Sequence, residues 1–496
     1  MSSDSNTPKI PVKLLVDRQK NKVVLAEAGK DFVDILFSFL TLPLGTIVRQ
    51  LEDHHGKPQP TIIGCLANLY GSVVDMGIDN FSTEVCKEML LRPRSVNEDR
   101  FRRVKVNLHG DATRYFMCPM FDDKSSCSKW YSNYSTSRCS CGKLMDVEIG
   151  LLEDDKVTDL VGDGGVFVSG QTGFIITDCL NVHLNSVGLV LSTLKGLGYA
   201  DLSELGTLVI DVGFKEVMTL LGCLFTSDST LTDVFLRKQS LYRVPRMNAA
   251  AYRLGQGCGN KISGEVIALT VFVKKQDRKI LCFECGEDFI DLLFTFLAVP
   301  LDYACQICCF NLGNVDPLWR SFDYLCCNKG REKSTLKCML PWYYRCQNEL
   351  LYVAYQQAPI YYRCISYTSG KFTRYSLTSD INKPLVYGWD KLVPMISVDP
   401  RLKNSSESMA ASSGFVKRNG RFMVSDDLTV TPLNSSSTTF LLKKLQVHLD
   451  DFEEQAISIG KNEAATLFRA SFLTSSALTT AFRSLLAKNP KQNRRV

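Results

Sequence analysis

The apolar residues of the segment that begins at Phe32 follow a helical period. Phe32, Ile35, Leu36, Phe39 and Leu40 are spaced by three and four residues, which places them on one face of a helix. Pro43 ends this helix and suits the first position of a following one. The pattern therefore predicts an amphipathic helix with Asp34 on its solvent-facing side.

Short alternating segments precede and follow this helix. The segments KLLVD and KVVLAEA flank a polar RQKN turn, which predicts a β-hairpin. Further along the chain, TLVIDVG predicts a strand, and FKEVMTLLGCLF predicts a helix directly after it. Hairpin strands followed by amphipathic helices predict the α+β fold class.

Much of this pattern occurs twice in the chain. The segment AEAGKDFVDILFSFLTLPLG, which begins at Ala26, returns as FECGEDFIDLLFTFLAVPLD from Phe283. FIITDCLNV at Phe174 returns as FMVSDDLTV at Phe422, and STLTDVF at Ser229 returns as SALTTAF at Ser476. The repeating unit is far longer than a solenoid repeat, so we predict a tandem duplication of one α+β domain.

The duplication divides the chain into four parts. We predict a first repeat at 11–236, with a Cys-rich loop at 118–142, and a basic linker at 237–265. A second repeat at 266–486, with a degenerate Cys-rich loop, and a basic tail at 487–496 complete the chain. The two repeats are expected to adopt the same fold.

Four segments of the chain match a known family pattern. They are KLLVDRQKNKVVLAEAGKDFVDILFSFLTLPLGTIV, the CSCGKLM around Cys141, GFIITDCL, and EVMTLLGCLFTSDSTLTDVF. Together they make the chain similar to the plant-specific domain of unknown function 674, and the similarity covers most of both repeats. This resemblance implies a plant protein with two tandem copies of the domain. It implies no activity, because none is established for the family.

Composition narrows the class of protein without revealing a function. The 496 residues are 45% hydrophobic and 22% charged, which excludes a mostly disordered or fibrous chain. The net charge of +6 is a mild bias at this length. The N-terminus lacks an apolar signal segment, and the apolar stretch from Phe32 to Leu44 is too short to span a bilayer. We therefore expect a cytoplasmic or nuclear protein without a membrane partner.

The 19 cysteines are expected to lie in a reducing compartment, where disulfides rarely persist, so they are core residues, metal ligands or reactive thiols. The second repeat contains two C-x-x-C pairs, Cys282 with Cys285 and Cys305 with Cys308. The matching positions of the first repeat hold apolar residues, namely Leu25, Ala28, Val48 and Leu51. Because a buried cysteine behaves as a small hydrophobic residue, we interpret both pairs as part of the core.

Cys118, Cys127, Cys139 and Cys141 form a different kind of group. They lie in a polar, Ser-rich stretch that cannot bury much apolar surface, so another interaction must order it. Four thiolates around a structural Zn²⁺ would do so, although the spacing C-x8-C-x11-C-x-C is uncommon. Free or redox-active thiols are the alternative.

The second repeat is not expected to bind zinc. It keeps one counterpart of the four cysteines, Cys364, which matches Cys118. Apolar contacts of Leu385, Tyr387 and Trp389 would order its loop instead.

No catalytic residue is predicted. Asp31 and Asp34 could form an acid–base pair or bind a hard cation, but a helix N-terminus also favours Asp31. Asp178 and the pair Asp426–Asp427 follow strands, where Asx turns or helix caps explain them. The five histidines show no metal-binding or triad spacing.

Three functional hypotheses remain open. The first is a non-enzymatic interaction or scaffold protein with an unknown protein partner and a structural zinc in its first repeat. The second is a nucleic-acid-associated binder that uses the four-cysteine element and the basic linker. The third is an enzyme with a site between the two repeats, which would need convergent polar groups in a deep pocket.

Overall fold

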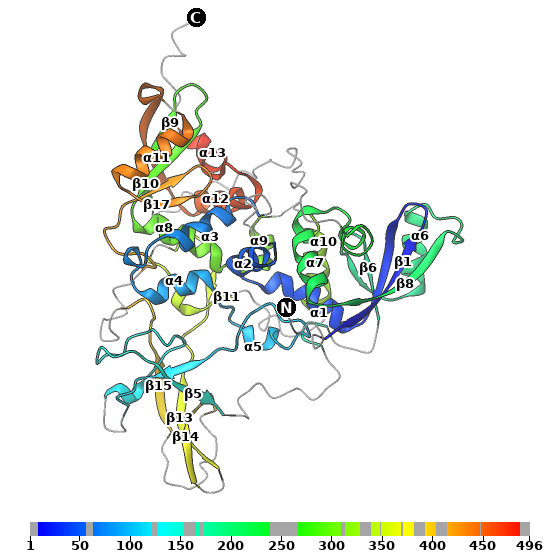
Figure 1. The fold of residues 1–496 in the computed structure, drawn as a ribbon, viewed down its shortest axis with the longest axis horizontal. Helices are drawn as coiled ribbons and strands as arrows, with labels where there is room; N and C mark the ends of the chain where they lie inside the picture. The colour runs from blue at the N-terminus through cyan, green and yellow to red at the C-terminus, as the bar shows by residue number, and fades with distance from the viewer. Residues whose placement is uncertain are drawn as a thin grey trace, which may run out of the picture.

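The computed structural model confirms an α+β protein with three main sheets around a central group of helices (Figure 1). It describes residues 8–55, 63–121, 126–152, 165–168, 173–238, 266–308, 313–327, 339–347, 349–368, 371–380, 392–402, 414–446 and 448–486. Most of the predicted linker, the tail, and Leu385, Tyr387 and Trp389 lie outside these residues.

Two five-stranded sheets have the same strand order. The first sheet has the order β7-β6-β2-β1-β8 and the second has the order β17-β16-β10-β9-β18. The strands of the first are β1 Ile10–Asp17, β2 Lys22–Ala28, β6 Phe174–Thr177, β7 Val182–Leu184 and β8 Leu205–Val212. Those of the second are β9 Ile267–Lys274, β10 Ile280–Cys285, β16 Phe422–Ser425, β17 Val430–Pro432 and β18 Phe452–Ile459. The predicted hairpin is the antiparallel pair of β1 and β2.

Helices fill the space between and beside these sheets. Those from the first half of the chain are α1 Lys30–Thr41, α2 Leu44–His55, α3 Leu66–Asp75, α4 Glu84–Leu91, α5 Glu98–Phe101, α6 Val187–Gly196 and α7 Phe214–Thr226. Those from the second half are α8 Glu287–Ala298, α9 Leu301–Cys308, α10 Val315–Phe322, α11 Ser435–Leu445, α12 Lys461–Leu473 and α13 Ala477–Phe482. The strand and helix predicted from TLVIDVG and FKEVMTLLGCLF are β8 and α7.

Each half of the chain gives one helix to the other half. Helix α3 packs on β17 of the second sheet, where the Ser72 hydroxyl accepts the Val430 N–H at 2.9 Å. Helix α10 packs on β7 of the first sheet, where the Ser321 hydroxyl accepts the Val182 N–H, also at 2.9 Å. The two contacts occupy matching places in the two sheets, so the packing crosses the boundary between residues 236 and 266.

The third sheet also combines both halves. Its six strands have the order β3-β5-β14-β13-β15-β4. They are β3 Tyr115–Met117, β4 Trp130–Tyr131 and β5 Val147–Leu151 from the first half, and β13 Tyr361–Thr368, β14 Lys371–Thr378 and β15 Val393–Ser397 from the second. The parallel pairs β5–β14 and β4–β15 join the two sets of strands. A two-stranded sheet of β11 Met339–Leu340 and β12 Ala354–Tyr355 lies apart from it.

Helix α1 is buried on every side, which corrects the predicted amphipathic pattern. The residues of its predicted apolar face are fully buried, as expected, but so is the rest of the helix from Phe32 to Thr41. Helices α9 and α10 of the second half pack against α1, and Phe37, which lies outside the predicted apolar face, contacts Phe322 of α10. Asp34 is therefore buried, and its carboxylate accepts the backbone N–H groups of Val166, Phe167 and Val168.

Candidate metal centre

The structure brings the four cysteines of the Ser-rich stretch together at one end of the third sheet. Cys118 follows β3, and Cys127 lies in a short 3-10 helix, Ser126–Lys129, that leads into β4. Cys139 and Cys141 lie in the turn that precedes β5. All four sulfur atoms lie within 4.8 Å of one another, and the Cys118 and Cys141 sulfurs are 3.5 Å apart.

A tight turn places the sulfur atoms of Cys139 and Cys141 close together. The Gly142 N–H donates to the Cys139 carbonyl at 2.8 Å, and the Cys139 N–H donates to the Lys143 carbonyl at 2.9 Å. Gly142 has φ of +85°, a left-handed conformation that favours glycine. The glycine of the C-x-C-G-K segment thus permits the turn that places two sulfurs on one side of the chain.

Apolar side chains enclose three of the four sulfurs. Cys118, Cys127 and Cys139 are buried in a small cluster with Phe116, Met145 and Val398, whereas Cys141 is exposed. Trp130, from β4, packs against the same cluster. The second half contributes Val398 just beyond β15, so both halves of the chain line the centre.

The electrostatics of the group oppose ionisation of all four thiols at once. Burial and the neighbouring thiols raise the pKa of Cys118 well above its usual range and raise the pKa of Cys127 to about 11. A hydrogen bond from the Lys143 N–H lowers the pKa of Cys141 to about 7. A divalent cation at the centre of the group would offset the repulsion among four thiolates, because metal binding deprotonates coordinating thiols.

The arrangement fits the dimensions of a tetrahedral zinc site. Zinc–sulfur bonds of about 2.3 Å at tetrahedral angles place the sulfurs roughly 3.8 Å apart. The Cys118–Cys141 sulfur separation of 3.5 Å and the upper limit of 4.8 Å for all pairs lie on either side of that value. The four thiols are the one such group of potential metal ligands among the residues that the structure describes.

The other cysteines of interest lie elsewhere. Cys282, Cys285 and Cys305 are buried among hydrophobic side chains, as predicted, while the side chain of Cys308 lies outside the described residues. Cys364 is buried in β13, where its thiol donates to the Ser376 carbonyl. None of these residues approaches a second group of ligands in the described part of the chain.

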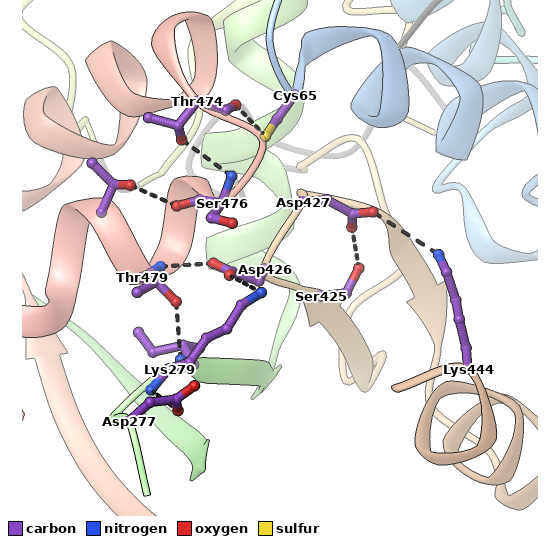
Figure 2. A network of polar contacts seen from close by, with 12 residues as sticks. Cys65, Asp277, Lys279, Ser425, Asp426, Asp427, Lys444, Thr474, Ser476 and Thr479 are labelled. Atoms are coloured by element: carbon purple, nitrogen blue, oxygen red, sulfur yellow. Dashed lines mark hydrogen bonds and ion pairs between the residues drawn. The ribbon is translucent and has the colours of Figure 1, made fainter. Parts of the chain in front are cut away.

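The predicted acidic residues have structural partners. Asp31 forms an ion pair with Lys105 at 2.6 Å, whereas the carboxylate of Asp34 binds backbone N–H groups. Two residues that follow strands, Asp178 and Asp426, cap helical segments: they accept the N–H groups of Thr232 and Thr479, each at 2.8 Å. Figure 2 shows Asp426 between Thr479 and Lys279.

A described cavity of about 510 Å³ lies within the second half of the chain. Its lining comes from residues 342–402 of the second half alone. The buried cation in its wall, Arg401, is already bound to Asp399 and to the Arg345 carbonyl.

Sequence reasoning found the four cysteines but missed the residues that enclose them. Phe116 and Met145 are near the cysteines in sequence, and their apolar character was the available signal. Val398 comes from a strand of the second half, and no local pattern connects it with Cys118.

The fold and the four-thiol group define an α+β protein with a candidate metal centre. Its family is established by a match over residues 6–462 with the family described as "Protein of unknown function (DUF674)". The chain belongs to this family, and the match runs across both halves. No curated protein and no solved structure matches the chain significantly. Among the described residues, no helix combines the length and the apolar character needed to cross a bilayer.

Proposed function

We propose that the protein is a non-enzymatic interaction or scaffold protein whose third sheet is held by one structural Zn²⁺. The observation that supports this proposal is the convergence of four cysteine sulfurs within 4.8 Å at the junction of the two halves. Cys118, Cys127, Cys139 and Cys141 would be the ligands. Soft thiolate ligands in a tetrahedral set favour zinc over hard cations such as magnesium or calcium.

A structural role for the metal is favoured over a catalytic one. Catalytic zinc sites keep one position open for water or substrate, whereas four protein thiolates fill all four positions. Three of the four sulfurs are buried, which further restricts access to the metal.

The metal would act on the sheet that the two halves share. Its ligands lie next to β3, β4 and β5, and these three strands would be tied together at one end. Strands β4 and β5 pair directly with β15 and β14 of the second half. Zinc would therefore stabilise the junction between the halves as well as its own loop.

Metal analysis of the purified full chain under reducing conditions tests this proposal. About one zinc per chain is expected, and Cys139→Ser should abolish binding because it removes one of four ligands. Cys364→Ser is the matched control, since this buried cysteine lies in the corresponding position of the second half. Absence of zinc from the wild-type protein, or its loss from the control variant, would contradict the proposal.

Binding to nucleic acid is a second proposed function that the same protein preparation can test. It would use the four-cysteine element and the basic linker at 237–265, of which 239–265 lie outside the described residues. A nucleic-acid binder should lose affinity steeply as salt increases, because phosphate contacts release counterions. A flat salt response of any measured binding would exclude it.

A further inference from the structure

Strand β8 forms an unusually apolar edge of the first sheet. It pairs with β1 on one side, and no strand in the described part of the chain pairs with its other side. Leu208 and Val209, in the middle of the strand, are 43% and 64% exposed. An edge strand offers a row of backbone N–H and C=O groups that can pair with another strand, and an apolar edge favours such pairing.

The corresponding edge of the second sheet is polar. Val209 lies opposite Lys13 of β1, and Ala456 of β18 lies opposite Thr270 of β9. Because Lys13 and Thr270 are equivalent positions of the two sheets, β8 and β18 can be compared residue by residue. β18 has Glu454, Gln455 and Ala456 where β8 has Thr207, Leu208 and Val209. Charged residues of this kind protect natural sheet edges from association.

The difference in polarity between the two sheet edges extends to the residues that flank β8 and β18. Helix α7 begins with Phe214, which is 43% exposed, at the place where α12 begins with Lys461. Leu202, just before β8, is also exposed. One of the two similar sheets therefore has an apolar edge with apolar flanks, and the other has a polar edge.

We propose that a second copy of this chain pairs with β8, antiparallel about a two-fold axis at Val209, to form one continuous sheet. In that register Val209 faces Val209 of the other copy, and Leu208 faces Ile210. Both are apolar pairs that remove exposed side chains from water. Because a two-fold contact uses the same surface twice, the strand must be complementary to itself.

The charges and flanks of β8 meet this requirement. Its one charged residue, Asp211, faces the uncharged Thr207 of the other copy in this register. The two Asp211 carboxylates are then roughly 14 Å apart, at 3.4 Å per residue, which exceeds the screening length of physiological salt. Leu202 and Phe214 lie beyond opposite ends of β8, so the two-fold axis brings each Phe214 to the end of the sheet that holds the other copy's Leu202.

This inference rests on the proposed interaction role, because it names a second copy of the chain as one partner. It does not require zinc to be bound at the four cysteines. Sedimentation or light scattering of the full chain over a range of concentrations is the test. The wild-type protein should form a dimer, and Val209→Lys should weaken dimerisation about tenfold or more, because two cations would meet at the axis. Ala456→Lys, at the matching exposed position of β18, should leave the dimer unchanged.

A charge-pair experiment tests the register. Thr207→Glu should weaken the dimer because it places a carboxylate opposite Asp211 of the other copy. Adding Asp211→Lys to the same chain should restore the dimer. Circular dichroism and zinc content, which should match those of the wild type, exclude misfolding as the cause.

Three results would overturn the inference: a wild-type monomer at all concentrations, a dimer insensitive to Val209→Lys, or equal disruption by Val209→Lys and Ala456→Lys. A wild-type monomer would leave β8 available for a strand of another protein. A monomer that still binds about one zinc per chain would contradict the dimer proposal and leave the metal proposal standing.

Discussion

Asp34 and Asp291 each fix a distant loop through its backbone. Asp34 binds the N–H groups of residues 166–168, and Asp291, its counterpart on α8, binds those of Phe415 and Val416. Both carboxylates are buried, and burial raises the pKa of each one. For Asp291 the pKa rises to about 7.

The raised pKa of Asp291 gives the first prediction. Between about pH 4 and pH 7 the folded protein retains a proton on Asp291 that the unfolded chain has released. The stabilisation from this group is therefore complete below pH 4 and is lost as the pH rises through 7. The loss is on the order of 4 kcal/mol, since a tenfold change in proton affinity corresponds to about 1.4 kcal/mol.

Urea denaturation of the wild type and Asp291→Asn at several pH values measures this effect. Asparagine keeps the acceptor oxygen but does not titrate in this range. The difference in unfolding free energy between the two proteins should change between pH 4 and pH 7. A pH-independent difference would show that Asp291 titrates alike in the folded and unfolded states.

The second prediction concerns Leu36, which is fully buried in α1. Leu36→Ala should lower the free energy of unfolding by about 2–5 kcal/mol, because it leaves a cavity in a core that cannot fully collapse. Val187→Ala is the matched control, since Val187 is 76% exposed, and it should change stability by less than about 0.5 kcal/mol. A loss below about 1 kcal/mol for Leu36→Ala in urea denaturation would contradict the observed packing.

At the scale of elements, the four-cysteine group lies next to the ends of three short strands. β3, β4 and β5 contain three, two and five residues. Trp130 of β4 packs against the cluster that contains three of the cysteines and is therefore placed to report on changes there.

The third prediction follows from this contact. Removal of the metal with a chelator under reducing conditions should change the tryptophan emission and lower the free energy of unfolding. The loss should be about 3 kcal/mol relative to a solution with free zinc 100-fold above the dissociation constant. The fluorescence change should disappear in Trp130→Phe, while the loss of stability remains. An unchanged emission spectrum in the wild type would show that the four thiols are not ordered by metal.

Local sequence patterns predicted individual helices and strands better than the tertiary contacts between them. Hydrophobic spacing located α1, the hairpin of β1 and β2, and the pair of β8 and α7. It could not show that α1 is buried all round, because the covering helices α9 and α10 lie in the other half of the chain. The sequence singled out the four candidate metal ligands, whereas Val398 reaches them through pairing of β4 with β15, which no local pattern encodes.

At the scale of the whole molecule, one hydrophobic core extends through both halves. It includes residues of both five-stranded sheets and of the helices that the halves exchange. Further contacts cross the boundary at the starts of α3 and α10, where the Cys65 N–H donates to the Ser471 carbonyl and the Asn314 N–H donates to the Leu224 carbonyl. The predicted duplication therefore does not imply two separable domains.

The fourth prediction is that cutting the linker will not separate the halves. A specific protease site inserted into residues 239–265 would yield two fragments. They should elute together from a native size-exclusion column at the size of the uncut protein, because α3 and α10 each remain packed on the other fragment's sheet. Denaturing electrophoresis confirms the cut. Two separate native peaks would show that the exchanged helices do not hold the halves together.

The exchange of α3 and α10 also has a consequence for synthesis on the ribosome. Ser72 precedes its partner Val430 by 358 residues. At roughly 5–20 residues per second, α3 waits from about 20 seconds to more than a minute for the strand that covers it. During that interval Leu66, Leu69 and Val73, all fully buried in the finished protein, lack their final neighbours. Nascent chains of this protein should therefore depend on chaperones that shield apolar helices until translation is complete.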